Sequence, residues 1–278
     1  MSEVQPASQD VPGVGSAPRP GRAERDSGRF LPLLGVATLL VVIAVWWTLT
    51  TWLAVIPPLY FPAPEEVVER IGRLSTVLLR DALATLLRVI VSWLVGSTLG
   101  VLVGLAMVRS RLLYASLSPI IEALRPIPPV ALIPFVILWF GIGDDGKIFL
   151  GALACFMVMV INTIVSAQNL SPVYMRAARS LGASDRQVYR TVVLPGIVPE
   201  LISGLRIGSA LAFAVIVAAE FLGAESGIGR LIMLASRTLD TPVVLLGTIV
   251  IGLQAFLLER VIKLGATRAT RWAERSSD

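Results

Sequence analysis

NLSPVYMRAARSLGASDRQVYRTVVLPG, residues 169–196, is a polar stretch between long apolar segments, and its residues predict two short helices joined by a tight turn. Pro172 suits a first helical position, because the N–H that it lacks would have no partner there. Gly182 can adopt the left-handed conformation that ends a helix. Ser184 and Gln187 then form a capping box for a second helix, so we expect a helical hairpin.

The composition of the chain is that of a membrane protein. Of its 278 residues, 55% are hydrophobic and only 15% are charged, and the mean hydropathy is +0.78, which is too apolar for an ordinary soluble fold. The formal charge of +5 does not indicate nucleic-acid binding, because the basic residues are dispersed over the loops instead of forming one face. The single cysteine, Cys155, excludes a disulfide within the chain, and we expect it to serve packing.

Long uncharged segments predict an all-α, polytopic membrane protein with six transmembrane helices. Residues 30–63 carry no charge at all, which exceeds the about 20 residues that a helix needs to cross the hydrocarbon core. Further apolar runs of sufficient length follow along the chain. The six expected spans lie within residues 30–56, 89–108, 112–143, 148–167, 197–222 and 241–258.

The distribution of basic residues predicts the orientation. Arginines are more frequent in the connections that share a side with the N-terminus, so the positive-inside rule places both termini and the hairpin in the cytoplasm. The expected organisation is a disordered cytoplasmic tail over 1–28, a first transmembrane helix over 30–56, an outer amphipathic segment over 62–82, a five-helix domain over 76–263 with the hairpin at 171–195, and a cytoplasmic tail over 264–278.

Two helices carry small residues at four-residue spacing, which lets neighbouring helices approach closely in lipid. The alternative is that glycine is merely tolerated in membrane helices. The glycines expected to serve helix packing are Gly96, Gly100 and Gly104 on one helix, and Gly204 and Gly208 on another.

Residues 112–143 contain several prolines, among them Pro128, which exclude a continuous ideal helix. Broken backbone at membrane depth is tolerated beside a watery cavity, so this region is a candidate lining of a transport path. Glu122 and Arg125 are expected to pair with each other or to face that path. Asn162 is expected to form an interhelical hydrogen bond or to contact a solute, and Arg206 to snorkel, pair or touch an anionic substrate.

RAARSLGAS (176–184) followed by VVLPG (192–196) resembles the cytoplasmic coupling loop of binding-protein-dependent ABC importer permeases. RPIPPVALIPFVILWFGIG (125–143) and AAEFLGAESGIGRLI (218–232) are similar to the nitrate, sulfonate and taurine branch of that family. Arg176 departs from the pattern, which has glutamate there, so the resemblance leaves the docking electrostatics open. The residues that the resemblance assigns to coupling with an ATPase are Arg176, Ala177, Ala178, Gly182, Ala183, Leu194 and Pro195.

The resemblance implies the type I importer permease fold and a multi-pass protein of the cell membrane. Its expected partners are a second copy of this chain, two ATP-binding subunits, an external solute-binding protein and membrane lipid, with no nucleic acid. The chain lacks a G-x-x-x-x-G-K-[ST] phosphate loop, so we expect no catalytic, metal or cofactor site in it, and ATP and Mg²⁺ to be bound by the partner ATPase. The expected solute is a small anion such as a sulfonate, taurine or nitrate.

An alternative function is an ion-coupled secondary transporter that works without an ATPase. Such a protein needs carboxylates within the membrane, and the candidates are Glu122, Glu200 and Glu220. A third alternative, a scaffold protein that uses the hairpin, leaves the proline-broken region unexplained.

Overall fold

The computed structural model describes residues 23–269, and the side chains of residues 34–266. Every regular element in that range is helical, which confirms the all-α class. Five helices are long and apolar enough to cross a membrane, and a bent pair brings the number to six if it forms one span. Contacts divide the chain into two units, Met1–Ala54 and Val55–Asp278.

The first unit holds one membrane-length helix. Helix α1 (Ala23–Trp47) continues into a π-helical turn, η1 (Thr48–Trp52). Of the tail predicted over 1–28, residues 23–28 belong to the first turns of α1, and residues 1–22 lie outside the described range. Most of the large hydrophobic side chains that the structure describes on α1 and η1 are exposed, as expected for a helix that faces lipid.

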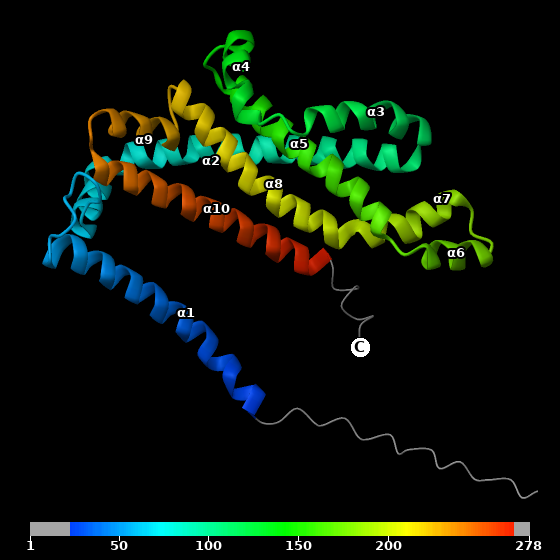
Figure 1. The fold of residues 1–278 in the computed structure, drawn as a ribbon, viewed down its shortest axis with the longest axis horizontal. Helices are drawn as coiled ribbons and strands as arrows, with labels where there is room; N and C mark the ends of the chain where they lie inside the picture. Colours follow the sequence, from blue (N-terminus) through cyan, green and yellow to red (C-terminus); the bar gives the residue numbers. More distant parts are fainter. Residues whose placement is uncertain (1–22, 270–278) are drawn as a thin grey trace, which may run out of the picture. The chain divides into compact units, whose positions relative to one another are not determined.

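The second unit is a bundle built around α2, α5 and α8, with α9 and α10 packed against α2 and α8 (Figure 1). Its buried core includes Val89, Cys155 and Ile216, one from each of the three central helices. The elements are α2 (Pro64–Arg109), α3 (Arg111–Leu124), η2 (Pro129–Leu132), α4 (Ile133–Phe140), α5 (Asp144–Asn169), α6 (Pro172–Ser180), α7 (Asp185–Val188), η3 (Tyr189–Val193), α8 (Leu194–Leu222), α9 (Ile228–Arg237) and α10 (Thr241–Ala269).

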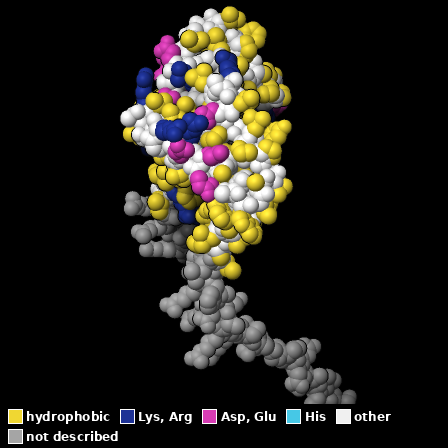
Figure 2. Space-filling model, turned by 90° about the vertical axis from the view of Figure 1, so that its left-hand side faces the viewer, with side chains coloured by type: hydrophobic (Ala, Val, Ile, Leu, Met, Phe, Trp, Pro, Cys, Tyr) yellow, Lys and Arg dark blue, Asp and Glu magenta, His cyan; other side chains and the backbone are white. Residues whose placement is uncertain are grey.

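The outer surface of these helices is apolar. Figure 2 shows hydrophobic side chains over much of the displayed face, with charged side chains of both signs beside one another. Leu99 and Leu102 on α2 and Phe256 and Leu257 on α10 are all exposed. Exposed aliphatic and aromatic surface of this extent suits hydrocarbon and not water.

The amphipathic segment predicted over 62–82 is not a separate element. Helix α2 runs without interruption for 46 residues, about 69 Å at 1.5 Å per residue, because residues 83–88, between this segment and the second span, include no glycine or proline and are mostly good helix formers. Leu74, Leu78 and Ala82 pack on the buried cluster of α9 and α10. The apolar face of the segment therefore contacts protein in addition to any membrane surface.

The proline-rich region is broken, as its sequence predicts. Helix α3 ends at Leu124, and the η2–α4 segment leaves it at an angle of 83°. Prolines at 126, 128 and 129 withhold backbone donors over the turn. On the far side of the break, Ile133 and Val136 pack into a buried cluster with Leu150 and Val215. The bend is thus fixed by packing on α5 and α8.

Glycines set the distance between α2 and α5. A Cβ added at Gly96 would overlap the backbone of Ala152, and one at Gly100 would lie 2.7 Å from the carbonyl oxygen of Phe156. Gly104 faces Thr163, and Gly204 of α8 faces Asn162 of α5 in the same way. A Cβ at Gly208 would meet nothing closer than 3.8 Å, so close approach does not require glycine there.

Two connections contain further helical structure. Pro195 does not interrupt the hairpin, because the π-helical turn η3 shifts the hydrogen-bond register and leads directly into α8. The connection between α8 and α10 contains the amphipathic helix α9, with Ile228, Leu231 and Ala235 buried. The C-terminal tail expected over 264–278 is helical as far as Ala269, and the remainder lies outside the described range.

Candidate functional site

The hairpin predicted at 171–195 consists of α6 and α7 joined at Gly182, whose φ of +83° is in the left-handed region. The turn is a Schellman motif, in which Ala183 N donates to Ala178 O at 3.1 Å and Gly182 N to Arg179 O at 2.9 Å. The capping box of Ser184 with Gln187 is present. Local sequence chemistry therefore determines the shape of this hairpin.

The hairpin is connected firmly to the bundle. Through α7 and η3 it continues into α8 without a loop. The hydroxyl of Tyr189 donates to the carbonyl oxygen of Leu105 at 3.1 Å, which ties η3 to α2. A displacement of the hairpin must accordingly move α8 and act on α2, because no flexible segment intervenes.

The tip of the hairpin is open to solvent. Leu181 is 88% exposed at the turn, and Val173 and Tyr174 are exposed in the first turn of α6. Arg179 and Asp185 form an ion pair across the turn at 3.1 Å, which at such exposure contributes little to stability. The hairpin thus exposes apolar side chains close to charged ones, and such a surface is suited to contact with another protein.

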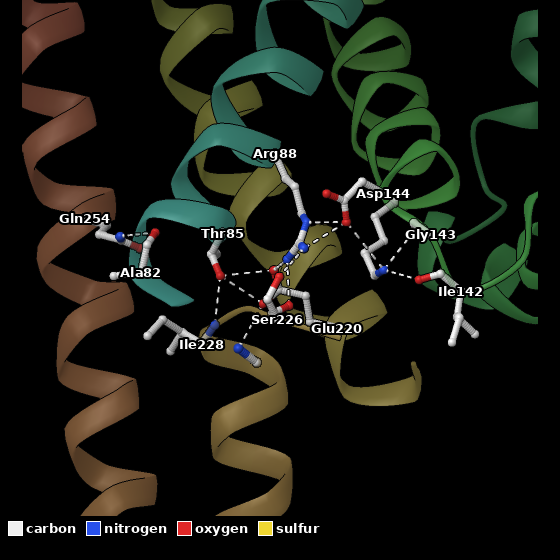
Figure 3. Close-up of polar contacts among 12 residues, drawn as sticks. Ala82, Thr85, Arg88, Ile142, Gly143, Asp144, Glu220, Ser226, Ile228 and Gln254 are labelled. Atoms are coloured by element: carbon white, nitrogen blue, oxygen red, sulfur yellow. Dashed lines mark hydrogen bonds and ion pairs between the residues drawn. The ribbon is translucent and has the colours of Figure 1, made fainter. Parts of the chain in front are cut away.

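A buried polar cluster links α2, α5, α8 and the start of α9 (Figure 3). Its centre is the carboxylate of Glu220, whose residue is 1% exposed. The carboxylate accepts hydrogen bonds from Arg88 Nη1 at 2.6 Å, Thr85 Oγ1 at 3.0 Å and Gly229 N at 2.9 Å. A buried charge is tolerated only when it is paired and hydrogen-bonded, and Glu220 satisfies both conditions.

Arg88 uses its whole guanidinium in the same cluster. Its Nε donates to Asp144 Oδ1 at 2.9 Å, and Nη1 and Nη2 donate to the backbone oxygen and the hydroxyl of Ser226 at 2.8 and 2.9 Å. The planar fork of arginine allows these contacts at once. Arg88 therefore joins the first turn of α5 to the α8–α9 connection.

The cluster also caps α9. The N-cap residue of this helix, Gly227, has no side chain, and its φ is +123°. Two of the free N–H groups of the first turn are satisfied from elsewhere: Ile228 N donates to Thr85 Oγ1, and Gly229 N to Glu220. A Cβ at Gly227 would overlap the Glu220 carboxylate, so glycine is needed there for space as well as for φ.

Two cavities lie beside the break in the α3–α4 region, and Arg125 borders both. One measures about 260 Å³ and is lined by Arg125 and Asn162 together with apolar side chains of α5 and α8. The other measures about 150 Å³ and is lined by Arg125, Glu122 and residues of α2, α3 and α5. Arg125, at the break, thus lines both cavities.

The comparisons with known proteins bear on this geometry. Residues 96–271 match the family described as the binding-protein-dependent transport system inner membrane component. The chain belongs to this family. It is the permease subunit of a binding-protein-dependent ABC importer, and ATP hydrolysis belongs to a separate subunit.

Two relatives and one solved structure illustrate this permease's relationships. The taurine transport system permease protein of Escherichia coli K12 is 39% identical, over 86% of this chain and 89% of its own length. The riboflavin transport system permease protein of Chloroflexus aurantiacus is 31% identical, over 83% and 90%. A chain of the inward-facing MetNI methionine ABC transporter is 23% identical and shares the fold, with a TM-score of 0.57 over 69% of this permease and 97% of that chain.

The permease structure separates the predicted coupling residues into two groups. Arg176 and Ala177 are exposed on α6, and Ala178 and Ala183 are half-buried beside the turn at Gly182. Leu194 and Pro195 are half-buried in the first turn of α8. The motif therefore spans the hairpin and the beginning of the helix that it joins.

Of the candidate pathway residues, Arg125 shares one cavity with Asn162 and the other with Glu122. Glu122 accepts a hydrogen bond from Ser118 at 2.9 Å, and no Glu122–Arg125 ion pair forms within the described part of the chain. Asn162 donates to Val158 O of its own helix at 2.9 Å instead of across helices. Arg206 pairs with Glu259.

Pro128 precedes η2 as its N-cap residue, and neither of the two cavities is lined by it.

Reasoning from the sequence missed the Arg88 cluster. Arg88 merely marks the edge of an uncharged run, and its partners Asp144 and Glu220 lie 56 and 132 residues away. Glu220, a candidate for ion coupling in a secondary transporter, is instead fully engaged in this cluster. The only sequence signal was the position of an arginine beside a span, where a charge needs a partner.

Proposed function

We propose that this permease carries a small organic sulfonate, such as taurine, across the inner membrane. The single observation that carries the proposal is the cavity that Arg125 lines together with mainly apolar side chains, since a sulfonate combines an anionic head with a hydrocarbon part. The 39% identity to a permease named for taurine transport supports the same class of solute. The relative named for riboflavin is less similar.

We infer that the working assembly contains two copies of this permease and two ATP-binding subunits, which hold ATP and Mg²⁺. A single bundle carries one hairpin, and closure of a pair of ATPase subunits requires two. The exposed apolar tip of α6 and α7 supports docking to such a subunit. The direct connection of the hairpin to α8 would transmit the closure, so the helices rock between inward-open and outward-open states.

Taurine uptake into proteoliposomes containing the permease, its ATPase and its binding protein tests the solute and the coupling together. Wild-type complex should accumulate taurine when ATP is supplied, and failure with taurine and ethanesulfonate alike would contradict the proposed solute class.

Gly182→Val should lower uptake at least about tenfold, because a β-branched residue held at positive φ is strained by about 1–3 kcal/mol and would reshape the docking turn.

Gly182→Asn is the matched control for that variant. Asparagine adopts the left-handed conformation readily, and a Cβ at this position meets nothing within 4 Å. Uptake by Gly182→Asn should therefore stay near the wild-type value. Equal activity of the valine and asparagine variants would remove the coupling role from this turn.

The proposed orientation has the hairpin and both termini in the cytoplasm. In a Cys155→Ser background, Glu225→Cys and Arg111→Cys place single thiols at exposed positions, one after α8 and one at the start of α3. Ser226 is unsuitable for this purpose because Arg88 binds it. An impermeant maleimide on intact cells should label Glu225→Cys alone, and inside-out vesicles should reverse the result; labelling of Arg111→Cys on intact cells would invert the topology.

A further inference from the structure

The geometry points to an oxyanion-binding site formed by Arg125 and Asn162, which holds the sulfonate head of the solute during its passage while the surrounding apolar wall holds the carbon chain. This inference rests on the proposed function for the identity of the solute. It adds a recognition site within the permease itself, separate from the external binding protein.

The charge of Arg125 is the first argument. Some arginines of the second unit pair with acidic side chains, as Arg88 does with Glu220 and Asp144 and Arg206 does with Glu259, and others, such as Arg80, form no ion pair among the described side chains. Arg125 forms no ion pair among the side chains that the structure describes. A cation placed within membrane-spanning segments is costly unless something compensates it, and an anionic solute supplies that compensation.

The position of Arg125 is the second argument. It is the C-cap residue of α3, at the point where the 83° bend begins. The cavity reaches from there to Asn162 of α5 and Ile207 near the middle of α8. A site assembled from three elements that meet at a bend will change shape when those elements rock, which is the property that a transit site requires.

Donors of suitable chemistry line this cavity. The guanidinium of Arg125 offers five N–H groups in a planar fork that matches oxyanions. The amide nitrogen of Asn162 uses one hydrogen toward Val158 O, and its second hydrogen is available to the solute. The cavity lining contains no acidic side chain, so an anion meets no like charge.

Size and polarity restrict the solute further. At about 260 Å³ the cavity is slightly smaller than the roughly 300–1,000 Å³ typical of drug-sized ligands. Its walls are mainly aliphatic, including Ile127, Pro129, Ile161, Ile207 and Leu211. A two- or three-carbon sulfonate fits this description better than a bare inorganic anion, which would leave the apolar wall without a contact.

The test measures charge selectivity inside the cavity without requiring transport. Ile207→Cys in the Cys155→Ser background places a thiol on the cavity wall of the purified permease–ATPase complex. The probes are 2-sulfonatoethyl and 2-(trimethylammonio)ethyl methanethiosulfonate. In each reaction the thiolate attacks the sulfenyl sulfur, a mixed disulfide forms, and methanesulfinate leaves. The quantity compared is the ratio of the anionic to the cationic rate constant.

We expect this ratio to exceed the ratio for a free thiol in solution by at least about tenfold, because Arg125 attracts the anionic reagent and repels the cationic one. Arg125→Gln should return the ratio to within about twofold of the solution value. The control Arg80→Gln removes an exposed arginine of α2 that does not line this cavity, and it should leave the ratio high. A preference that persists in Arg125→Gln, or a thiol that reacts with neither reagent, overturns the site.

Protection of the Ile207→Cys thiol by added anions identifies which anion the site binds. In phospholipid-free detergent, ethanesulfonate should slow labelling of Ile207→Cys and should lose this effect in Arg125→Gln. Protection by phosphatidylglycerol alone would assign the site to a lipid head group and overturn the inference for a solute. Since labelling does not depend on uptake, a complex that shows the Arg125-dependent preference but imports no sulfonate contradicts the proposed function and not the anion site.

Discussion

Replacement of Glu220 by alanine is expected to lower the free energy of unfolding of the permease by about 3–5 kcal/mol, the usual cost of breaking a buried ion pair from one side. Arg88 would keep Asp144 but lose its buried partner. The N–H of Gly229 and the hydroxyl of Thr85 would lose the same acceptor. The apparent Tm of the protein in detergent should fall accordingly, and α9 should become accessible to protease.

Asp144→Ala is the matched control, because it removes the other carboxylate that contacts Arg88. The side chain of Asp144 is 57% exposed, and exposed pairs contribute only about 0–1 kcal/mol. We therefore expect a small change in Tm for Asp144→Ala and a large one for Glu220→Ala. Equal losses in the two variants would show that burial does not govern the strength of this cluster.

The double variant Arg88→Leu with Glu220→Leu separates the ion pair from its surroundings. Replacing both charges removes the unpaired charge that makes each single variant costly, so the double variant should be less destabilised than the sum of the single ones. Some loss should remain, because the N–H of Gly229 in the first turn of α9 still lacks Glu220 as an acceptor. Full additivity would indicate that Arg88 and Glu220 are not coupled.

Gly96→Ala is expected to destabilise the permease by about 1–3 kcal/mol or more, since the new methyl group would overlap the backbone of Ala152 on α5. Backbone cannot move aside as the end of a flexible side chain can. The two helices would have to separate, and every contact along their shared face would weaken. The apparent Tm in detergent is the measurement.

Gly72→Ala is the control on the same helix. A Cβ at Gly72 meets nothing within 4 Å, and alanine favours a helix over glycine by about 0.8–1.0 kcal/mol. Gly72→Ala should leave the Tm unchanged or raise it. The two variants make the same chemical change in α2, so the opposite signs isolate the helix–helix contact. A Tm that rises for Gly96→Ala would contradict close packing at this point.

Much of this architecture follows from local sequence. Uncharged runs longer than a bilayer predict the spans, and prolines near Pro128 predict the bend, because both properties act within a few residues. The hairpin is equally local: Gly182, Ser184 and Gln187 define its turn and cap. Local patterns do not predict that the chain stays helical up to Pro195 and beyond, because the π-helical turn η3 ends at Val193 and leaves Pro195 in the first turn of α8, where proline is tolerated.

What the sequence alone determined is thus the class, the long apolar helices and the form of the hairpin, while the tertiary structure decided which charges meet. Glu122 and Arg125 stand about one helical turn apart, yet no ion pair joins them in the described part of the chain, and Glu122 accepts a hydrogen bond from Ser118 instead. Arg88 and Glu220, 132 residues apart, form the buried pair instead. Helical periodicity fixes the direction of a side chain from its own helix, but the partner that it meets depends on how distant helices pack.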